Sequence, residues 1–167
     1  MLLTLLSWDM LHKEKTMKSD FQMVDYSVLK FVYDIENPHV EMSSYNFQLK
    51  NKIHIQEDER KGSITSLVTA VGSSDIDDES TVKIQLLFAA LFRAASETDA
   101  NNFSKMLSLN GMATIIPIIR STLLTASSVL GIKGKVILPN IDVTKLEWNN
   151  DIVLDTIPKE NVEEVNP

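Results

Sequence analysis

The chain has 167 residues, enough to bury one hydrophobic core without disulfides or structural metals. It contains no cysteine, which excludes a disulfide scaffold, thiolate metal sites and cysteine catalysis, and fits a reducing compartment. A net charge of −7 makes nucleic acid and anionic membranes poor partners, and it favours either simple solubility or a basic protein partner.

The chain begins with an apolar stretch, MLLTLLSW, that is too short to cross a bilayer, which takes about 20 residues. It lacks the basic start and cleavage site of a signal peptide. Residues 1–16 are either a translated leader ahead of a start at Met17 or a short docking helix. We expect residues 1–18 to be an extension, residues 19–150 to form one domain, and the acidic residues 151–167 to form a flexible tail.

Alternating apolar and polar side chains predict a first strand from Val24 to Ile35, with one face in the core. Val28 and Val32 make its second face partly apolar. The strand ends at Asn37-Pro38, because proline has no backbone donor. The predicted core face holds Leu29, Phe31, Tyr33 and Ile35.

The clearest alternation runs from Tyr45 to Gln56 and predicts a second strand. Asn51 interrupts its apolar row, so we expect a bulge or bend there. The charged turn 57–62 ends in glycine and predicts a hairpin to a third strand, Ser63 to Val71.

The loop 72–80 carries a carboxylate cluster but lacks the glycine and terminal glutamate of a calcium loop, which favours a solvated turn. A fourth strand follows from Thr81 to Ala95. One of its faces is wholly apolar, and Leu87 and Leu91 make the other apolar in the middle, as in a central or doubly covered strand. A helix over residues 86–95 is the competing interpretation.

The second half is helical. Thr98-Asp99 is a typical N-cap, followed by a short helix to Leu109 and a break at Asn110-Gly111. A long helix is predicted from Ile115 to Leu130, ended by glycines. Pro117 suits its first turn, or marks a kink if the helix already begins near Met112.

The apolar surface of this long helix is wider than one sheet requires. Small side chains such as Ser121 and Thr125 would let a neighbour approach closely. We therefore expect the helix to cover the sheet and also to form a subunit interface. The residues assigned to that interface are Ile116, Ile119, Leu123 and Leu130.

No catalytic, metal or cofactor motif is present in the sequence. His12, His39 and His54 lack the spacing of helical metal ligands. Arg120, in the apolar helix, either binds a carboxylate or has a structural role. The sequence predicts a protein without enzymatic activity or cofactor; a small-molecule or enzymatic α+β domain, with Arg120 and His54 clustered near the sheet acids, is the alternative.

Several short motifs carry a resemblance. Pro117 and Arg120 lie in IIPIIR at the start of the long helix, Gly131 follows the helix, and LPNIDV occupies residues 138–143. Glu36 precedes the proline that ends the first strand. Motifs and element order resemble the SecB family of export chaperones, which implies an α+β fold: a four-stranded antiparallel Greek-key or meander sheet covered by one long helix.

The resemblance covers residues 26–146 and implies an ATP-independent cytoplasmic holdase, a dimer of dimers that binds non-native polypeptides in hydrophobic grooves. In the family the SecA motor docks on sheet acids; Glu36 is the matching acid here, and apolar Val32 replaces another. Some SecB-like proteins instead serve one client, such as an antitoxin. The acidic net charge favours clients with basic or neutral segments. Subunit contacts are the competing explanation for the predicted client-binding residues: Val28, Val32, Leu87, Leu91, Val136 and Leu138.

Overall fold

The structure is a computed structural model that describes residues 20–37, 39–56, 60–76 and 81–148. The predictions for the N-terminal extension and for the acidic tail lie outside these residues. So do those for most of the hairpin turn after the second strand and for the carboxylates at positions 77–79.

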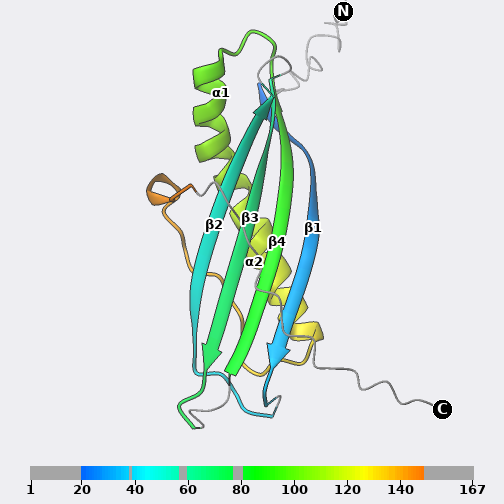
Figure 1. Ribbon diagram of the computed structural model, residues 1–167, viewed down its shortest axis with the longest axis vertical. Helices are drawn as coiled ribbons and strands as arrows, with labels where there is room; N and C mark the ends of the chain where they lie inside the picture. Colours follow the sequence, from blue (N-terminus) through cyan, green and yellow to red (C-terminus); the bar gives the residue numbers. More distant parts are fainter. Residues whose placement is uncertain (1–19, 38, 57–59, 77–80, 149–167) are drawn as a thin grey trace, which may run out of the picture.

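The predicted strands are confirmed: β1 (Phe21–Ile35), β2 (Ser44–Gln56), β3 (Lys61–Ser73) and β4 (Thr81–Ala94). They form one antiparallel sheet in the order β1-β4-β3-β2. Strands β2 to β4 follow one another as neighbours, whereas β1 connects to β2 across the whole width of the sheet (Figure 1). This is a Greek key, and the competing interpretation of the fourth strand as a helix is wrong.

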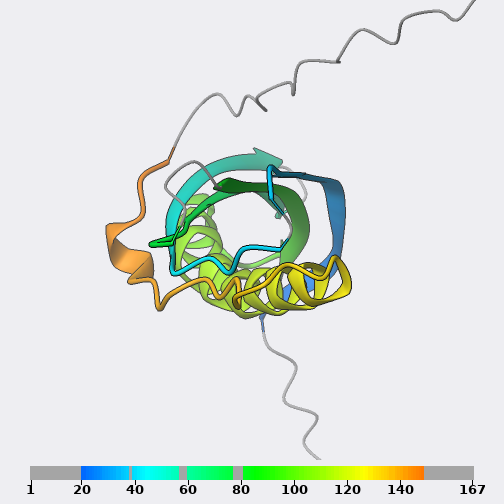
Figure 2. The ribbon, with the colours of Figure 1, turned by 90° about the horizontal axis from the view of Figure 1, so that it is seen from below.

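Helices close one side of the sheet. One continuous helical run consists of α1 (Ala100–Met106), a π-helical turn (Leu107–Gly111) and α2 (Met112–Val129). A 3₁₀ turn, Val143–Lys145, follows later in the chain. Viewed along the strands, the sheet is strongly curved and α2 lies along its open side (Figure 2). Because α2 begins three residues earlier than predicted, Pro117 lies inside the helix.

The start of α1 is as predicted, but the break predicted at Asn110-Gly111 is wrong. Asp99 caps α1, and its carboxylate accepts a hydrogen bond of 2.9 Å from the backbone of Asn102. At Asn110 the chain continues helically through the π turn. A Cβ on Gly111 would lie 2.6 Å from Cδ1 of Ile64, so the glycine permits close helix–sheet packing.

Gly131 ends α2 as predicted, with φ at +68°. Its amide donates to the carbonyl of Ser128 at 3.2 Å, and the amide of Ile132 donates to that of Ser127 at 3.0 Å. This pair of bonds is a Schellman motif, which satisfies carbonyls at the helix end.

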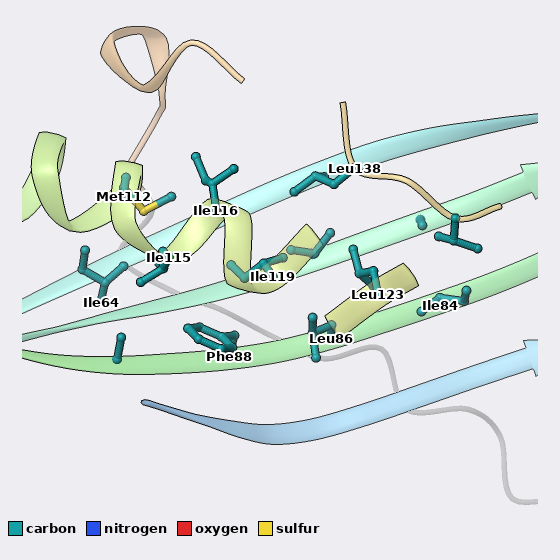
Figure 3. Packing of buried hydrophobic residues seen from close by; sticks show 14 of the residues in the cluster. Ile64, Ile84, Leu86, Phe88, Met112, Ile115, Ile116, Ile119, Leu123 and Leu138 are labelled. Atoms are coloured by element: carbon teal, nitrogen blue, oxygen red, sulfur yellow. The ribbon is translucent and has the colours of Figure 1, made fainter. Parts of the chain in front are cut away.

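The core-facing stripe of α2 packs on the inner face of the sheet (Figure 3). Ile116, Ile119 and Leu123 are at most 6% exposed, so their assignment to a subunit interface is wrong: the sheet of the same chain already covers them. Leu130, beyond the end of the helix, is half-buried and packs outside this core.

The assignment of Val136 and Leu138 to client binding is also wrong. Both were predicted to contact clients, yet they are 0% and 1% exposed and belong to the core. Arg120 holds this extended segment in place: its Nε donates to the carbonyl of Leu138 at 2.8 Å and its Nη2 to that of Pro139 at 2.9 Å. The structural interpretation of Arg120 is therefore the correct one.

The predicted irregularity at Asn51 is absent, because β2 and β3 remain in register through the pair Asn51–Ser66. The hydroxyl of Ser66 donates to Oδ1 of Asn51 at 2.8 Å, which accommodates this polar pair in a buried position.

The bulges lie in β1 instead and change which residues share a face. One bulge lies between Val28 and Lys30, so Leu29 is an extra residue and is exposed rather than in the core. Val28 is paired with the core residue Phe88 on the inner face. Val32 lies on the outer face. The prediction that Val28 and Val32 share one face is therefore wrong.

Candidate binding surfaces

An open apolar cavity of about 750 Å³ lies between β1 and the side of α2 turned away from the core. We call it the β1–α2 groove. Its β1 wall is aromatic, and its helix wall has mainly small or apolar side chains. None of the lining residues is charged, so the groove suits apolar side chains. It is lined by Tyr26, Phe31, Pro117, Ile118, Ser121, Thr122, Thr125, Ala126, Val129 and Leu130.

The strand beside this groove is a sheet edge. β1 pairs only with β4, so its other backbone edge has no strand partner in the described part of the chain. Exposed edges of this kind are templates for pairing with another chain. Large exposed apolar side chains gather on this strand: Val24, Tyr26, Val28, Leu29 and Tyr33.

The second surface is the outer face of the sheet, opposite the helix. Val32 and Leu87 are half-buried there, and Leu91 is 51% exposed. Leu91 borders a hollow of about 380 Å³ whose lining also includes His54 and Arg93. Among the predicted client-binding residues, these three apolar side chains remain on a face that no described helix covers.

The outer face is basic, although the whole chain carries −7. The ladder register places six cationic side chains on it and two carboxylates, those of Asp25 and Asp34. Glu147 lies beside β2, because the next residue, Trp148, forms a bridge with Asn51. His54, which is exposed, lies on the same face. The cationic residues are Lys30, Lys50, Lys52, Lys61, Lys83 and Arg93.

Glu36, the predicted docking acid, is exposed but already has partners in the chain. Its carboxylate accepts hydrogen bonds from the backbone and the hydroxyl of Thr81, at 3.2 and 2.8 Å. These bonds tie the end of β1 to the start of β4. A docking role for Glu36 stays a prediction, and the outer face adds no acidic cluster to it.

The polar residues named for an enzymatic site do not converge. His54 lies on the outer face, whereas Arg120 is bound to carbonyls beside α2. Within residues 20–148, apart from the undescribed gaps, no three side chains of the metal-binding types come together. His12 lies outside the described residues.

The helical run Ala100–Val129 has the length and mean hydropathy, 1.4, of a membrane-crossing helix. That property rests on length and composition alone. One side of the run packs on the sheet, and a core helix passes the same test.

A curved Greek-key sheet of four antiparallel strands, with one long helix along its open side, is the SecB-like fold. The predicted fold class is confirmed by the solved structure of the Mycobacterium tuberculosis Rv1957 SecB-like chaperone, in complex with a ChAD peptide from the Rv1956 HigA1 antitoxin. The two chains share 14% identity with a TM-score of 0.59, over 73% of this chain and 91% of the other.

A second similar structure is a protein of unknown function from Streptococcus agalactiae. It shares 17% identity over 72% of this chain and 97% of that one, with a TM-score of 0.38. No family model matches the chain, and no curated protein matches its sequence.

Proposed function

We propose that the protein is an ATP-independent holdase that binds non-native polypeptides in the cytoplasm. The observation that carries this proposal is the apolar surface left uncovered on a hydrogen-bonded sheet, at β1 and on the outer face. Contiguous exposed apolar surface is characteristic of binding sites. The SecB-like fold supports the proposal, as does the antitoxin peptide bound to the similar chaperone.

We assign the β1–α2 groove to self-association. Two copies can pair their β1 edges about a two-fold axis, which would also bring the apolar grooves together. The interface on α2 then shifts around the helix, from the core-facing stripe to Ile118, Thr122 and Val129. A dimer of dimers is compatible with this arrangement.

We assign client binding to the outer face, at Val32, Leu87 and Leu91. A purified sample should delay aggregation of a chemically unfolded protein without nucleotide. The double variant Leu87→Ser/Leu91→Ser should hold the client several-fold less well. Leu109→Ser, which removes an exposed leucine from the helical region, is the matched control. No delay at several-fold molar excess of the wild type would sink the holdase proposal.

Light scattering tests the assembly separately. The wild type should have at least twice the mass of one chain, and Ile118→Asp/Val129→Asp should reduce the mass to that of a single chain. The control Leu124→Asp places one aspartate on an exposed residue of α2 that does not line the groove, and it should leave the mass unchanged. A monomeric wild type would contradict the assembly and leave the holdase proposal standing.

The runner-up is a SecB-like chaperone dedicated to one client, such as an antitoxin. The basic outer face favours it over general protein export, because the resemblance places SecA docking on sheet acids. Affinity capture with purified SecA discriminates the two. Tight, saturable SecA binding would favour export, whereas an antitoxin gene beside this one, together with the selective holding of its product, would favour the dedicated role. The enzymatic alternative gains no support, since the polar residues proposed for it lie apart.

A further inference from the structure

The middle of the outer face places a lysine on each side of two leucines. Ladder pairing aligns Lys50 on β2 with Leu67 on β3, Leu67 with Leu87 on β4, and Leu87 with Lys30 on β1. Neighbouring strands lie about 4.8 Å apart, so the two lysine backbones are about 14 Å apart. Lys52 extends the basic side by one more row.

The positive charge of this row acts locally. Lys50 lies six residues from each end of β2, about 20 Å along the strand, or roughly two Debye lengths at physiological salt. Charges in the connections between strands are therefore screened from it. Lys30, Lys50 and Lys52 are exposed and form no ion pair with any other described residue.

The carboxylates of this face are few and peripheral. Asp25 and Asp34 both lie on the edge strand β1, and Asp34 is opposite Lys83 in the ladder. Glu147 lies beside the other edge strand, β2, because the next residue, Trp148, forms a bridge with Asn51. An acidic group placed over Leu67 and Leu87 would thus meet lysines on both flanks. This is the reverse of what the net charge of the whole chain suggests.

We propose that the outer face selects polypeptide segments that are acidic and amphipathic, with apolar residues flanked by carboxylates. A helix is about 10–12 Å wide with its side chains and fits between the lysine rows. Its apolar stripe would rest on Leu87 and Leu91, since Leu67 is only 3% exposed, while its carboxylates reach Lys50, Lys52 and Lys30. The proposal rests on the proposed holdase function and names its client class.

The apolar centre favours a polypeptide over a nucleic acid. A phosphate backbone offers no apolar group to cover Leu87 and Leu91, and desolvating them against phosphate gives no compensating contact. The net charge of −7 further opposes a long polyanion, whereas a short acidic segment meets chiefly the local field.

Fluorescence anisotropy with designed peptides tests the proposal. The probe is a labelled 18-residue peptide with leucines at helical spacing and glutamates on both flanks; its partner peptide has lysine at each glutamate position. Wild-type protein should bind the glutamate peptide at least about tenfold more tightly, and less tightly as salt rises from 50 to 200 mM. Lys50→Glu/Lys52→Glu should abolish or reverse this preference.

Lys105→Glu, a charge reversal at an exposed lysine of α1, is the matched control and should bind as the wild type does. If the double reversal does not fold by circular dichroism, Lys50→Gln/Lys52→Gln removes the charges without reversing them and should cost several-fold in affinity. Equal affinity for both peptides, or an unchanged preference in the folded double variant, overturns the proposal.

Two further outcomes are decisive. Binding of a labelled 20-nucleotide single-stranded DNA that is lost in Lys50→Glu/Lys52→Glu, without peptide binding, would overturn it in favour of a nucleic-acid surface. If the wild type holds an unfolded client but does not discriminate between the peptides, the proposed function stands and this inference falls. Selective peptide binding without client holding supports the acidic partner and removes the holdase function.

Discussion

Replacing Arg120 by methionine should destabilise the fold, because its guanidinium joins α2 to the extended segment that follows it. The side chain is half-buried and donates to the carbonyls of Leu138 and Pro139. A hydrogen bond from a charged donor contributes about 1.5–3 kcal/mol, and the exposed part of this contact contributes less. We expect a loss of about 2–3 kcal/mol. Arg120→Lys should lose roughly half as much, since an ammonium lacks the planar fork.

Thermal and urea unfolding followed by circular dichroism measure this loss. For a chain of this size, 2–3 kcal/mol corresponds to a fall in Tm of roughly 5–10 °C. Arg93→Met, on the outer face, is the matched control and should stay within about 0.5 kcal/mol of the wild type.

A double-mutant cycle tests the coupling to the buried segment. Leu138→Ala alone should cost about 2–5 kcal/mol, because Leu138 is 1% exposed and its truncation leaves a cavity. The double variant Arg120→Met/Leu138→Ala should lose less stability than the sum of the two single losses, by more than about 0.5 kcal/mol, since both substitutions release the same segment. Strict additivity, or an Arg120→Met variant as stable as the wild type, would refute this account.

Three further outcomes are expected. Ser66→Ala should destabilise the chain by about 1–3 kcal/mol, because it leaves the buried Oδ1 of Asn51 without its described donor. The double variant Asn51→Leu/Ser66→Ala should recover most of that loss, since it also removes Nδ2 of Asn51, which has no partner among the described residues. Urea midpoints measure both changes. Hydrogen bonds from the backbone and side chain of Asn102, in the first helical turn, hold the pKa of Asp99 below its usual 3.8. The stability that Asp99 provides is therefore present above pH 3.8 and is lost as the pH falls through the lower pKa of the folded state. Asp99→Asn should flatten this part of an acid unfolding titration, and an unchanged profile would contradict the assignment. Gly134→Ala should destabilise more than Gly131→Ala, because both glycines have positive φ but only at Gly134 would a Cβ lie 2.8 Å from a backbone oxygen of the β1–β2 connection; equal falls in Tm would argue against that contact.

Secondary structure was largely predictable from the sequence because its signals are local. Period-2 alternation identified all four strands, and helical spacing with a glycine stop identified α2. The break predicted at Asn110-Gly111 failed for a tertiary reason: the glycine allows the helix to approach Ile64, and its lack of a Cβ serves packing rather than a turn.

Which side chains are available for binding was decided only by the tertiary structure. Apolar patterning predicts burial but does not say what covers a residue, so Leu138 and the core stripe of α2 were assigned to interfaces that the chain itself fills. One bulged residue in β1 moved Val28 to the inner face, because a one-residue shift exchanges the two faces of a strand.

Charge shows the same division. Composition fixed the net charge of −7, and from it we expected basic or neutral clients. Strand register decided where the charges lie: it aligns Lys50 and Lys30 on either side of Leu67 and Leu87, on a face where carboxylates are scarce. The sequence by itself therefore determined the strands, the long helix and the total charge. The tertiary structure decided which surface stays uncovered and what its local sign is, because both depend on pairings between residues far apart in the chain.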